Sequence, residues 1–288
     1  MSIYIPPHIK IIVEDDSGEV RHSQSLSDYF QQPNINILSA TYGSTLLDIL
    51  VEESYISSTL QLNQIFTGNP NADATRMIGS IAECLVVDIC HKHPEANRLL
   101  GMHARFGSRP SQKLDEYVAV ATGSMRAKRL YQQHYNPSDT QRDVIWVEKK
   151  NTQNQLLCIS NNNSISAKPA GLQIKASHDG VRYVLPTIQN YHYPVLYFDL
   201  DGDWAKVREA MIDNNINCHL INPDSIHHEL RHALQAYFDI VIALIDGRTT
   251  TQQVIADSKY NMDSILGAGV DGSELIGTPQ IILPSNIR

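Results

Sequence analysis

The sequence lacks several features that would assign a protein to a well-marked class. No apolar run in its 288 residues approaches the roughly 20 residues that a membrane-spanning helix requires, so no membrane association is expected. The first residues, MSIYIPPHIKIIVEDD, do not combine a basic segment with a following apolar one, and a signal peptide is therefore not expected. We find neither an internal repeat nor a long low-complexity tract.

Cysteine is scarce, and its spacing is uninformative for metal binding. The chain has four cysteines, at Cys84, Cys90, Cys158 and Cys218, and no C-x-x-C pair occurs among them. They are scattered through the chain, mostly among apolar residues. This pattern predicts reduced, buried thiols in a cytoplasmic protein.

The chain also lacks a net positive charge. Its formal charge of -8 argues against a protein that coats nucleic acid without specificity. The charge is uneven, however, because residues 98–150 contain ten basic and five acidic side chains. This basic middle could bind a polyanion locally, or it could be a solvated face without a partner. With 42% hydrophobic and 19% charged residues, the composition is that of an ordinary globular protein.

The sequence predicts three regions. Residues 1–70 form an N-terminal α+β extension or subdomain, with strand-like segments HIKIIVE and NINILSA and a helical pattern around STLLDILVEESY. Residues 71–245 form the main core, and residues 246–288 form an irregular, then extended C-terminal tail that packs on this core.

The core region predicts an α/β fold in which helices flank a central mixed β-sheet. A helix from Asp73 to about His91 is apolar on nearly all sides and is expected to be buried. A weaker helical pattern covers residues 116–135, and residues 161–169 are expected to form a polar loop. Strands are expected at 143–150, 154–160, 170–177, 182–186 and 194–200, and helices at Trp204–Asn214 and His227–Tyr237.

Four residues within these elements form a candidate catalytic site. Glu83 lies in the apolar helix with small or apolar residues one turn away on either side, where an unpaired carboxylate is costly. Asp143 begins an apolar strand. Gln173 and Lys175 alternate with Leu172 and Ile174 and therefore share one face of a later strand.

These side-chain types suit phosphodiester hydrolysis. Hard oxygen ligands hold Mg²⁺, which polarises the phosphate and acidifies a water molecule, and an ammonium group stabilises the developing negative charge. Asp143 and Gln173 are the expected metal ligands, with Glu83 as a further ligand or a base acting through water. Lys175 is expected to face the phosphate. Mn²⁺ could replace Mg²⁺.

In order and element type, this set resembles the PD-(D/E)XK, or restriction-endonuclease-like, superfamily. The core of that family is a helix carrying an acid, a strand with Asp, a strand with (D/E)-x-K, a crossover helix and a further strand. The matching positions are Glu83, Asp143 and the Q-I-K segment at 173–175, and the resemblance covers roughly residues 71–245. Gln173 stands where Glu or Asp is commoner, which corresponds to a Q-x-K variant. An additional strand or hairpin is expected between Asp143 and Gln173.

The resemblance implies a Mg²⁺-dependent endodeoxyribonuclease that cleaves DNA and, by analogy, works as a homodimer. A restriction or anti-phage role is expected rather than general repair, because the flanking segments resemble no common repair module. The basic middle then supplies the side chains expected to bind DNA, which are Arg126, Lys128, Arg129, Lys149 and Lys150. The alternative is a nucleic-acid-binding module that keeps the fold without catalysis.

Two further motifs suggest other enzyme classes. HELRH at 228–232 matches H-E-x-x-H, in which His228 and His232 would bind zinc and Glu229 would act as the base of a metallopeptidase. Arg231 is unusual for such a site, and the nearest acidic third ligand considered, Glu274, is far along the chain. YFDLDGDW at 197–204 resembles the first motif of haloacid-dehalogenase phosphatases, although a strand-to-helix turn with Asp201 or Asp203 as N-cap explains it well.

Overall fold

The computed structural model of the chain describes residues 9–260 except 16, 58, 64–65, 151–155 and 162–163. Thr75–Gln235 forms one compact unit, and the parts of the chain on either side of it together form another. No helix among the described residues combines the length and the apolar character that crossing a bilayer requires.

The unit built from the two ends of the chain combines a β-hairpin with helices. Its elements are β1 (Lys10–Glu14), β2 (Val20–Ser25), α1 (Leu26–Gln31), α2 (Ile35–Glu52) and α10 (Thr251–Ser258). The side chains of Ser25, Asn34 and Thr250 accept a backbone N–H in the first turn of α1, α2 and α10. These caps explain where the helices begin.

Two predictions for this unit were wrong. Residues 34–40 were expected to form a strand, but they begin α2, because Asn34 caps the helix and the apolar residues that follow keep helical spacing through Leu47. The segment after Gly247 was expected to be irregular, but Thr250 caps α10 there. The predicted packing of the tail beyond residue 260 lies outside the described residues.

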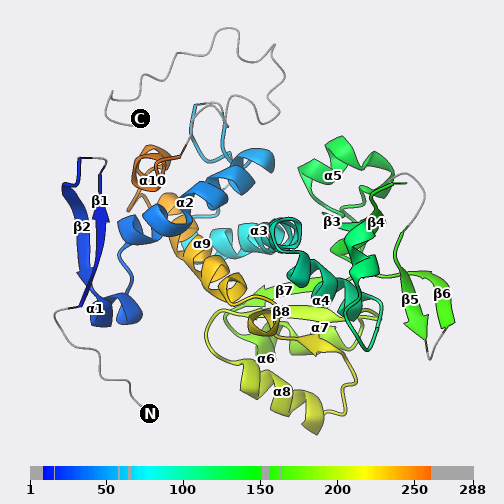
Figure 1. Cartoon of the computed structure of the whole chain (residues 1–288). Coiled ribbons are helices and arrows are strands. Elements are labelled where there is room, and N and C mark those ends of the chain that lie inside the picture. The colour runs from blue at the N-terminus through cyan, green and yellow to red at the C-terminus, as the bar shows by residue number, and fades with distance from the viewer. Residues whose placement is uncertain are drawn as a thin grey trace. The chain divides into compact units, whose positions relative to one another are not determined.

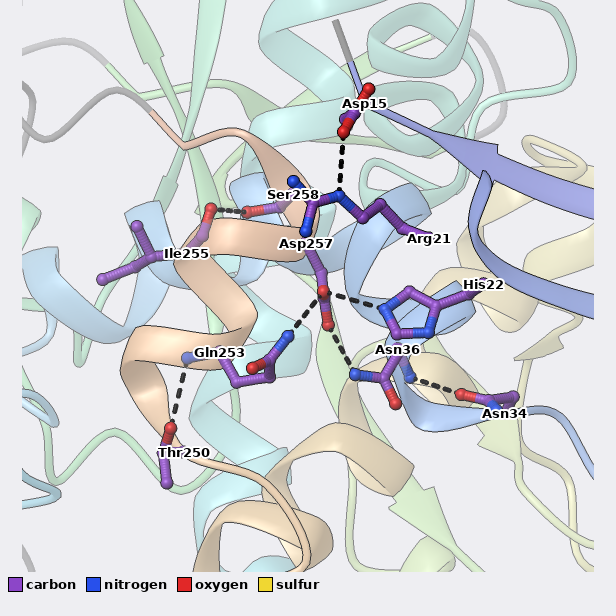
Figure 2. A network of polar contacts seen from close by, with 10 residues as sticks. All are labelled: Asp15, Arg21, His22, Asn34, Asn36, Thr250, Gln253, Ile255, Asp257 and Ser258. Carbon is purple, nitrogen blue, oxygen red and sulfur yellow. Dashed lines mark hydrogen bonds and ion pairs between the residues drawn. The ribbon is translucent and has the colours of Figure 1, made fainter. Parts of the chain in front are cut away.

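Asp257 joins the hairpin to the helices of this unit (Figure 2). Its side chain is 6% exposed. Its carboxylate accepts hydrogen bonds from Nδ2 of Asn36 at 2.9 Å and from Nε2 of Gln253 at 2.7 Å. It also lies 3.2 Å from Nε2 of His22. Contacts from β2, α2 and α10 therefore converge on one buried carboxylate, which fixes these elements to one another.

The other unit contains the predicted core elements. In chain order these are α3 (Pro70–Lys92), α4 (Pro94–Ala104), a 3₁₀ turn (Gln112–Glu116), β3 (Tyr117–Ala121), α5 (Met125–Leu130), a second 3₁₀ turn (Gln132–His134), β4 (Val144–Glu148), β5 (Cys158–Asn161), β6 (Ser164–Pro169), β7 (Gln173–Ser177), α6 (Gly180–Tyr183), α7 (Leu185–Ile188), β8 (Val195–Asp199), α8 (Trp204–Asp213), β9 (Leu220–Ile221), a third 3₁₀ turn (Pro223–Ser225) and α9 (Glu229–Ile245), which continues into the first unit.

The predicted α/β class is confirmed, but among the described residues the strands of this unit form several small sheets and not one central mixed sheet. β3 pairs antiparallel with β4, whereas β7 pairs in parallel with β8, and β8 in parallel with β9. An antiparallel bridge between Val144 and Leu172 joins the two groups. The parallel step from β7 to β8 passes through α6 and α7, which is the crossover that parallel strands require.

Helices α6, α7 and α8 cover one side of β7 and β8 (Figure 1). Their residues Ile188 and Val207 pack with Val195 and Tyr197 of β8. The alternate residues of β8, Leu196 and Phe198, are also fully buried. Burial on both faces explains why this strand is a continuous apolar run rather than an alternating one.

The helix around residues 73–91 and the strands at 143–150 and 194–200 are confirmed as α3, β4 and β8. Several other predictions were wrong. Residues 182–186 lie in the short helices α6 and α7, and the first part of the weak helix at 116–135 is β3. The predicted loop 161–169 largely belongs to β6, which pairs with β5 and supplies the extra hairpin before Gln173. The residues 150–154 that were expected to join two strands lie mostly outside the described part.

Candidate active site

Asp143 and Gln173 meet where β4 and β7 come together. The backbone N–H of Leu172 donates to the Val144 carbonyl at 2.8 Å, and the N–H of Asp143 donates to the Leu172 carbonyl at 2.8 Å. Nε2 of Gln173 then donates to Oδ2 of Asp143 at 2.6 Å, and the N–H of Ile174 donates to the same oxygen at 2.7 Å. Two of the predicted site residues are therefore in direct contact.

Within the described part of the chain, this contact leaves the buried amide oxygen of Gln173 without a hydrogen bond. Gln173 is 4% exposed, yet its Oε1 has no hydrogen-bond partner among the residues that the structure describes. Among the described residues, the Asp143 side chain accepts two hydrogen bonds, from Gln173 and from Ile174, and both go to Oδ2. Oδ1 accepts neither of them. An unpaired buried amide oxygen costs about 1–3 kcal/mol and calls for an explanation. Carboxylate and amide oxygens are ligands that hard cations such as Mg²⁺ use.

The environment of Asp143 disfavours its charged form. Burial raises the pKa of Asp143 to about 6. The Ile174 N–H and the Lys175 ammonium act against this rise, and the nearby Asp139 carboxylate adds to it. A cation beside Oδ1 would favour the ionised carboxylate. A buried acid with a raised pKa is a common property of functional sites.

Lys175 lies on the same face of β7 as Gln173, as the strand alternation predicted. Its Nζ sits 5.1 Å from the centroid of the Tyr191 ring. The ammonium lowers the pKa of Asp143 through its charge. The structure therefore holds a positive charge next to the Asp143–Gln173 pair.

Glu83 lies at the same end of β3 and β4 as Asp143. Its Oε2 is 3.7 Å from the position that a Cβ atom on Gly123 would occupy. Gly123 follows Thr122, whose N–H donates to the Asp143 carbonyl at 2.8 Å. Glu83 therefore approaches the site through the turn after β3, and Asp143 and Gln173 are in direct side-chain contact.

The basic residues expected to bind DNA fall on two elements. Arg126, Lys128 and Arg129 lie on α5, and Arg126 and Lys149 both act on His91, whose pKa is lowered chiefly by burial and further by these two charges. Lys149 and Lys150 follow the end of β4 that is opposite to Asp143. At about 3.3 Å per strand residue, this places them roughly 20 Å along the strand from Asp143.

The HELRH segment does not present a zinc site of the predicted kind. Because α9 begins at Glu229, His228 lies outside the helix, and its side chain is 83% exposed and stacks on His227. The two histidines therefore do not form a helical i, i+4 pair. Arg231 is paired with Asp224 at 2.9 Å. In the part of the chain that the structure describes, no three His, Cys, Asp or Glu side chains are grouped to hold a metal ion, and Glu274 lies outside that part.

The aspartates of YFDLDGDW serve to close a turn. Asp199 accepts the N–H groups of Asp203 at 2.8 Å and Trp204 at 2.8 Å, where α8 begins. Asp203 accepts the Tyr197 hydroxyl at 2.6 Å and the Gly180 N–H at 2.5 Å. These oxygens accept hydrogen bonds from the protein itself, but the predicted cap by Asp201 or Asp203 was wrong, because the Asp203 side chain makes no cap hydrogen bond and Asp199 accepts the first N–H of α8.

Residues that the sequence did not single out surround the candidate site. Arg142 lies immediately before Asp143, and its guanidinium is 5.7 Å from the centroid of the Tyr193 ring; Nζ of Lys168 is 4.7 Å from the same ring. Tyr191 supports Lys175. The sequence signal that could have pointed to these residues is a Tyr-x-Tyr segment directly before an apolar strand. This pattern alone is too common to indicate a functional site.

We compared the chain with protein-family models, with curated proteins and with solved structures, and none of the three comparisons gives a match.

Proposed function

We propose that the protein is a Mg²⁺-dependent endodeoxyribonuclease with a restriction-endonuclease-like core, as the resemblance of its motifs implies. The observation that carries the proposal is the contact between Gln173 and Asp143 beside the Lys175 ammonium, with the buried Oε1 of Gln173 left without a hydrogen-bond partner among the described residues. The order of elements also supports it: a helix with Glu83, β3, β4 after Asp143, β7 with Q-x-K, a helical crossover and β8.

The residues present fit a hard divalent cation. Oδ1 of Asp143 and Oε1 of Gln173 would hold it, with Glu83 as a further oxygen donor from α3. When bound, Mg²⁺ neutralises phosphate charge and lowers the pKa of water. The Gln173 amide group holds Asp143 in place through Nε2, so the two oxygens keep their positions relative to each other.

Lys175 has a separate part in the proposed reaction. Its ammonium would stabilise the negative charge that develops on the phosphate, and the Tyr191 ring holds it in position. Because the positive charge is already fixed beside the carboxylate, little reorganisation is needed when the substrate binds.

The proposal is tested by the cleavage of plasmid and of linear duplex DNA in Mg²⁺, Mn²⁺ or EDTA. Lys175→Ala should lower Mg²⁺-dependent cleavage by about a thousandfold or more, with an unchanged melting temperature. Lys206→Ala is the matched control, since Lys206 lies exposed on α8. Unchanged cleavage in the Lys175→Ala protein would rule out this site.

The same assay decides the alternative. DNA binding without cleavage in either metal would favour a non-catalytic DNA-binding module with the same fold. Light scattering of the full chain, alone and with duplex, tests the expected homodimer, and a restriction or anti-phage role follows only if cleavage of DNA is found.

A further inference from the structure

His103 and His219 bring two imidazole nitrogens together at the surface of the unit Thr75–Gln235. Nδ1 of His103 lies 2.9 Å from Nε2 of His219. The ring centroids are 5.0 Å apart, with an angle of 36° between the ring planes. His103 is half-buried and His219 is exposed, so the pair is open to solvent. The two residues are 116 positions apart in the chain, and their contact therefore depends on the fold.

Both histidines come from anchored backbone. His103 lies in the last turn of α4, where its carbonyl accepts the N–H of Phe106 at 2.9 Å. His219 directly precedes β9, and its carbonyl accepts the N–H of Val195 in β8 at 2.9 Å. The two imidazoles are therefore close together before any ligand binds, which lowers the entropy that binding would cost.

The pair is separate from the candidate active site. Gln173 and Leu220 are both in register with Val195, one on each side of it. Val195 and Leu220 pack with helices α6, α7 and α8. Because neighbouring residues of an extended segment alternate, His219 points to the opposite face of the sheet, where α4 supplies His103.

The contact shows that these nitrogens can act as ligands. An imidazole nitrogen accepts a hydrogen bond only when it carries a lone pair, so at least one of the two facing nitrogens is unprotonated. Partial burial lowers the pKa of both side chains, and the charge of His219 lowers the pKa of His103 further. Neutral rings therefore predominate at pH 7, and neutral imidazole is the form that binds metal ions.

The spacing of the two nitrogens suits neighbouring positions around one ion. At Zn–N distances of about 2.0–2.1 Å, two tetrahedral ligands lie about 3.4 Å apart. The facing nitrogens, now 2.9 Å apart, need to separate only slightly to reach this spacing. Among the described residues, no third His, Cys, Asp or Glu side chain completes a metal-binding group with them, so water would take the remaining positions.

We propose that His103 and His219 form a binding site for a divalent transition-metal ion of the kind that imidazole prefers, with Zn²⁺ as the ion to be tested. His103 binds through Nδ1 and His219 through Nε2. The ring whose facing nitrogen carries the shared proton gives it up to water and gains one on its other nitrogen, so binding releases no net proton. The site goes beyond the proposed function and differs from the oxygen ligands at Asp143, which suit Mg²⁺.

The test titrates ZnCl₂ into the full-length protein, without a histidine tag and in excess MgCl₂, followed by calorimetry and by NMR of the imidazole nitrogens. The signals of His103 Nδ1 and His219 Nε2 should shift together with the first equivalent of Zn²⁺. His219→Gln removes one nitrogen ligand but keeps a group that can bind His103 through a hydrogen bond. It should lower the Zn²⁺ affinity about tenfold or more. His192→Gln, at an exposed histidine of the same unit, is the matched control and should leave the affinity unchanged.

A second variant tests the other ligand. His103→Gln should lower the Zn²⁺ affinity as much as His219→Gln does. Zn²⁺ should also raise the melting temperature of the wild type and of His192→Gln, because it binds the folded state, but not that of either ligand variant. If His103→Gln alone proves unstable without metal, the exposed His219→Gln carries the test.

Other side chains of the same unit provide the outcomes that would overturn the proposal. The ring centroid of His227 lies 4.3 Å from that of His93 and 4.7 Å from that of His228. If His227→Gln lowers the Zn²⁺ affinity and His219→Gln does not, the ion binds at that cluster and the proposed pair is wrong. A loss in Asp143→Asn alone would place Zn²⁺ at the candidate active site and contradict the proposal equally. None of these measurements uses DNA cleavage, so the proposed function is tested separately.

Discussion

Asp143 and Asp199 stand at strand ends in the same unit, but the protein treats their carboxylates in opposite ways. Oδ1 of Asp199 accepts the N–H groups of Asp201 and Asp203, and its Oδ2 accepts that of Trp204. Although burial tends to raise the pKa of Asp199, these backbone donors outweigh it and the pKa is lowered. Asp143 receives two hydrogen bonds on one oxygen, and burial raises its pKa to about 6.

The two carboxylates therefore differ in role. That of Asp199 stabilises the fold, whereas that of Asp143 suits the binding of a ligand. The hydrogen bonds of Asp199 close the turn after β8 and begin α8, so its charge stabilises the folded state. Asp143 is kept in surroundings that disfavour its charge, next to Gln173, whose buried Oε1 has no partner in the described part of the chain. Groups arranged in this way are costly for stability and are typical of functional sites.

The strongest test of this comparison is the substitution of each aspartate by asparagine. Asp143→Asn should lower Mg²⁺-dependent DNA cleavage by about a thousandfold or more, because a neutral amide replaces the anionic metal ligand. Asp199→Asn should lower cleavage less than about tenfold at a temperature well below its melting point, since it only changes a turn. Single-turnover cleavage of duplex DNA measures both. Equal losses in the two variants would contradict the division of roles.

Asp199→Asn should have the larger effect on stability. An asparagine has one acceptor oxygen in place of two, so backbone donors at the start of α8 lose their charged partner, and the free energy of unfolding should fall by about 2 kcal/mol. This corresponds to roughly 5 °C in melting temperature. Asp213→Asn, at the exposed end of α8, is the matched control.

The pH dependence of this loss has a definite sign. The pKa of Asp199 is lower in the folded state than its ordinary value of 3.8, so its stabilising effect is present above that pH and disappears as the pH falls through the folded-state pKa. The difference between wild type and Asp199→Asn should therefore be full at pH 7 and shrink below about pH 4. A constant difference across this range would mean that the charge of Asp199 is not the cause.

The sequence predicted the elements whose patterns follow directly from burial. The apolar helix containing Glu83 and the apolar strands after Asp143 and before Leu200 were found, because their periodicity or continuous apolar character reports the packing around them. The segment Arg182–Pro186 has strand-like composition but forms part of a crossover, since the parallel pairing of β7 with β8 requires a connection over the sheet. That requirement is tertiary and is not visible locally.

The candidate site was predictable in its residue types but not in its details. Strand alternation correctly put Gln173 and Lys175 on one face, and the order of motifs suggested Asp143 as their neighbour. The sequence could not show that Nε2 of Gln173 binds Asp143 while Oε1 stays unpaired, because this depends on how β4 and β7 meet. Nor could it connect Tyr193 with Lys168, which lie 25 residues apart and on different elements.

The smallest expected effect concerns the stability of the protein without metal. In EDTA at pH 8, Asp143→Asn should unfold with a free energy about 1 kcal/mol higher than wild type, because the charge that burial disfavours is removed. The gain is limited because the new amide N–H₂ group also needs an acceptor near Gln173.

The folded-state pKa of about 6 lies above the ordinary 3.8, so wild type loses stability as the pH rises through this range. The advantage of Asp143→Asn should therefore vanish below about pH 4, opposite in sign to the effect of Asp199→Asn. Denaturant unfolding at both pH values, with Asp213→Asn as control, measures it; a less stable Asp143→Asn protein at pH 8 would show that the carboxylate, like that of Asp199, mainly supports the fold.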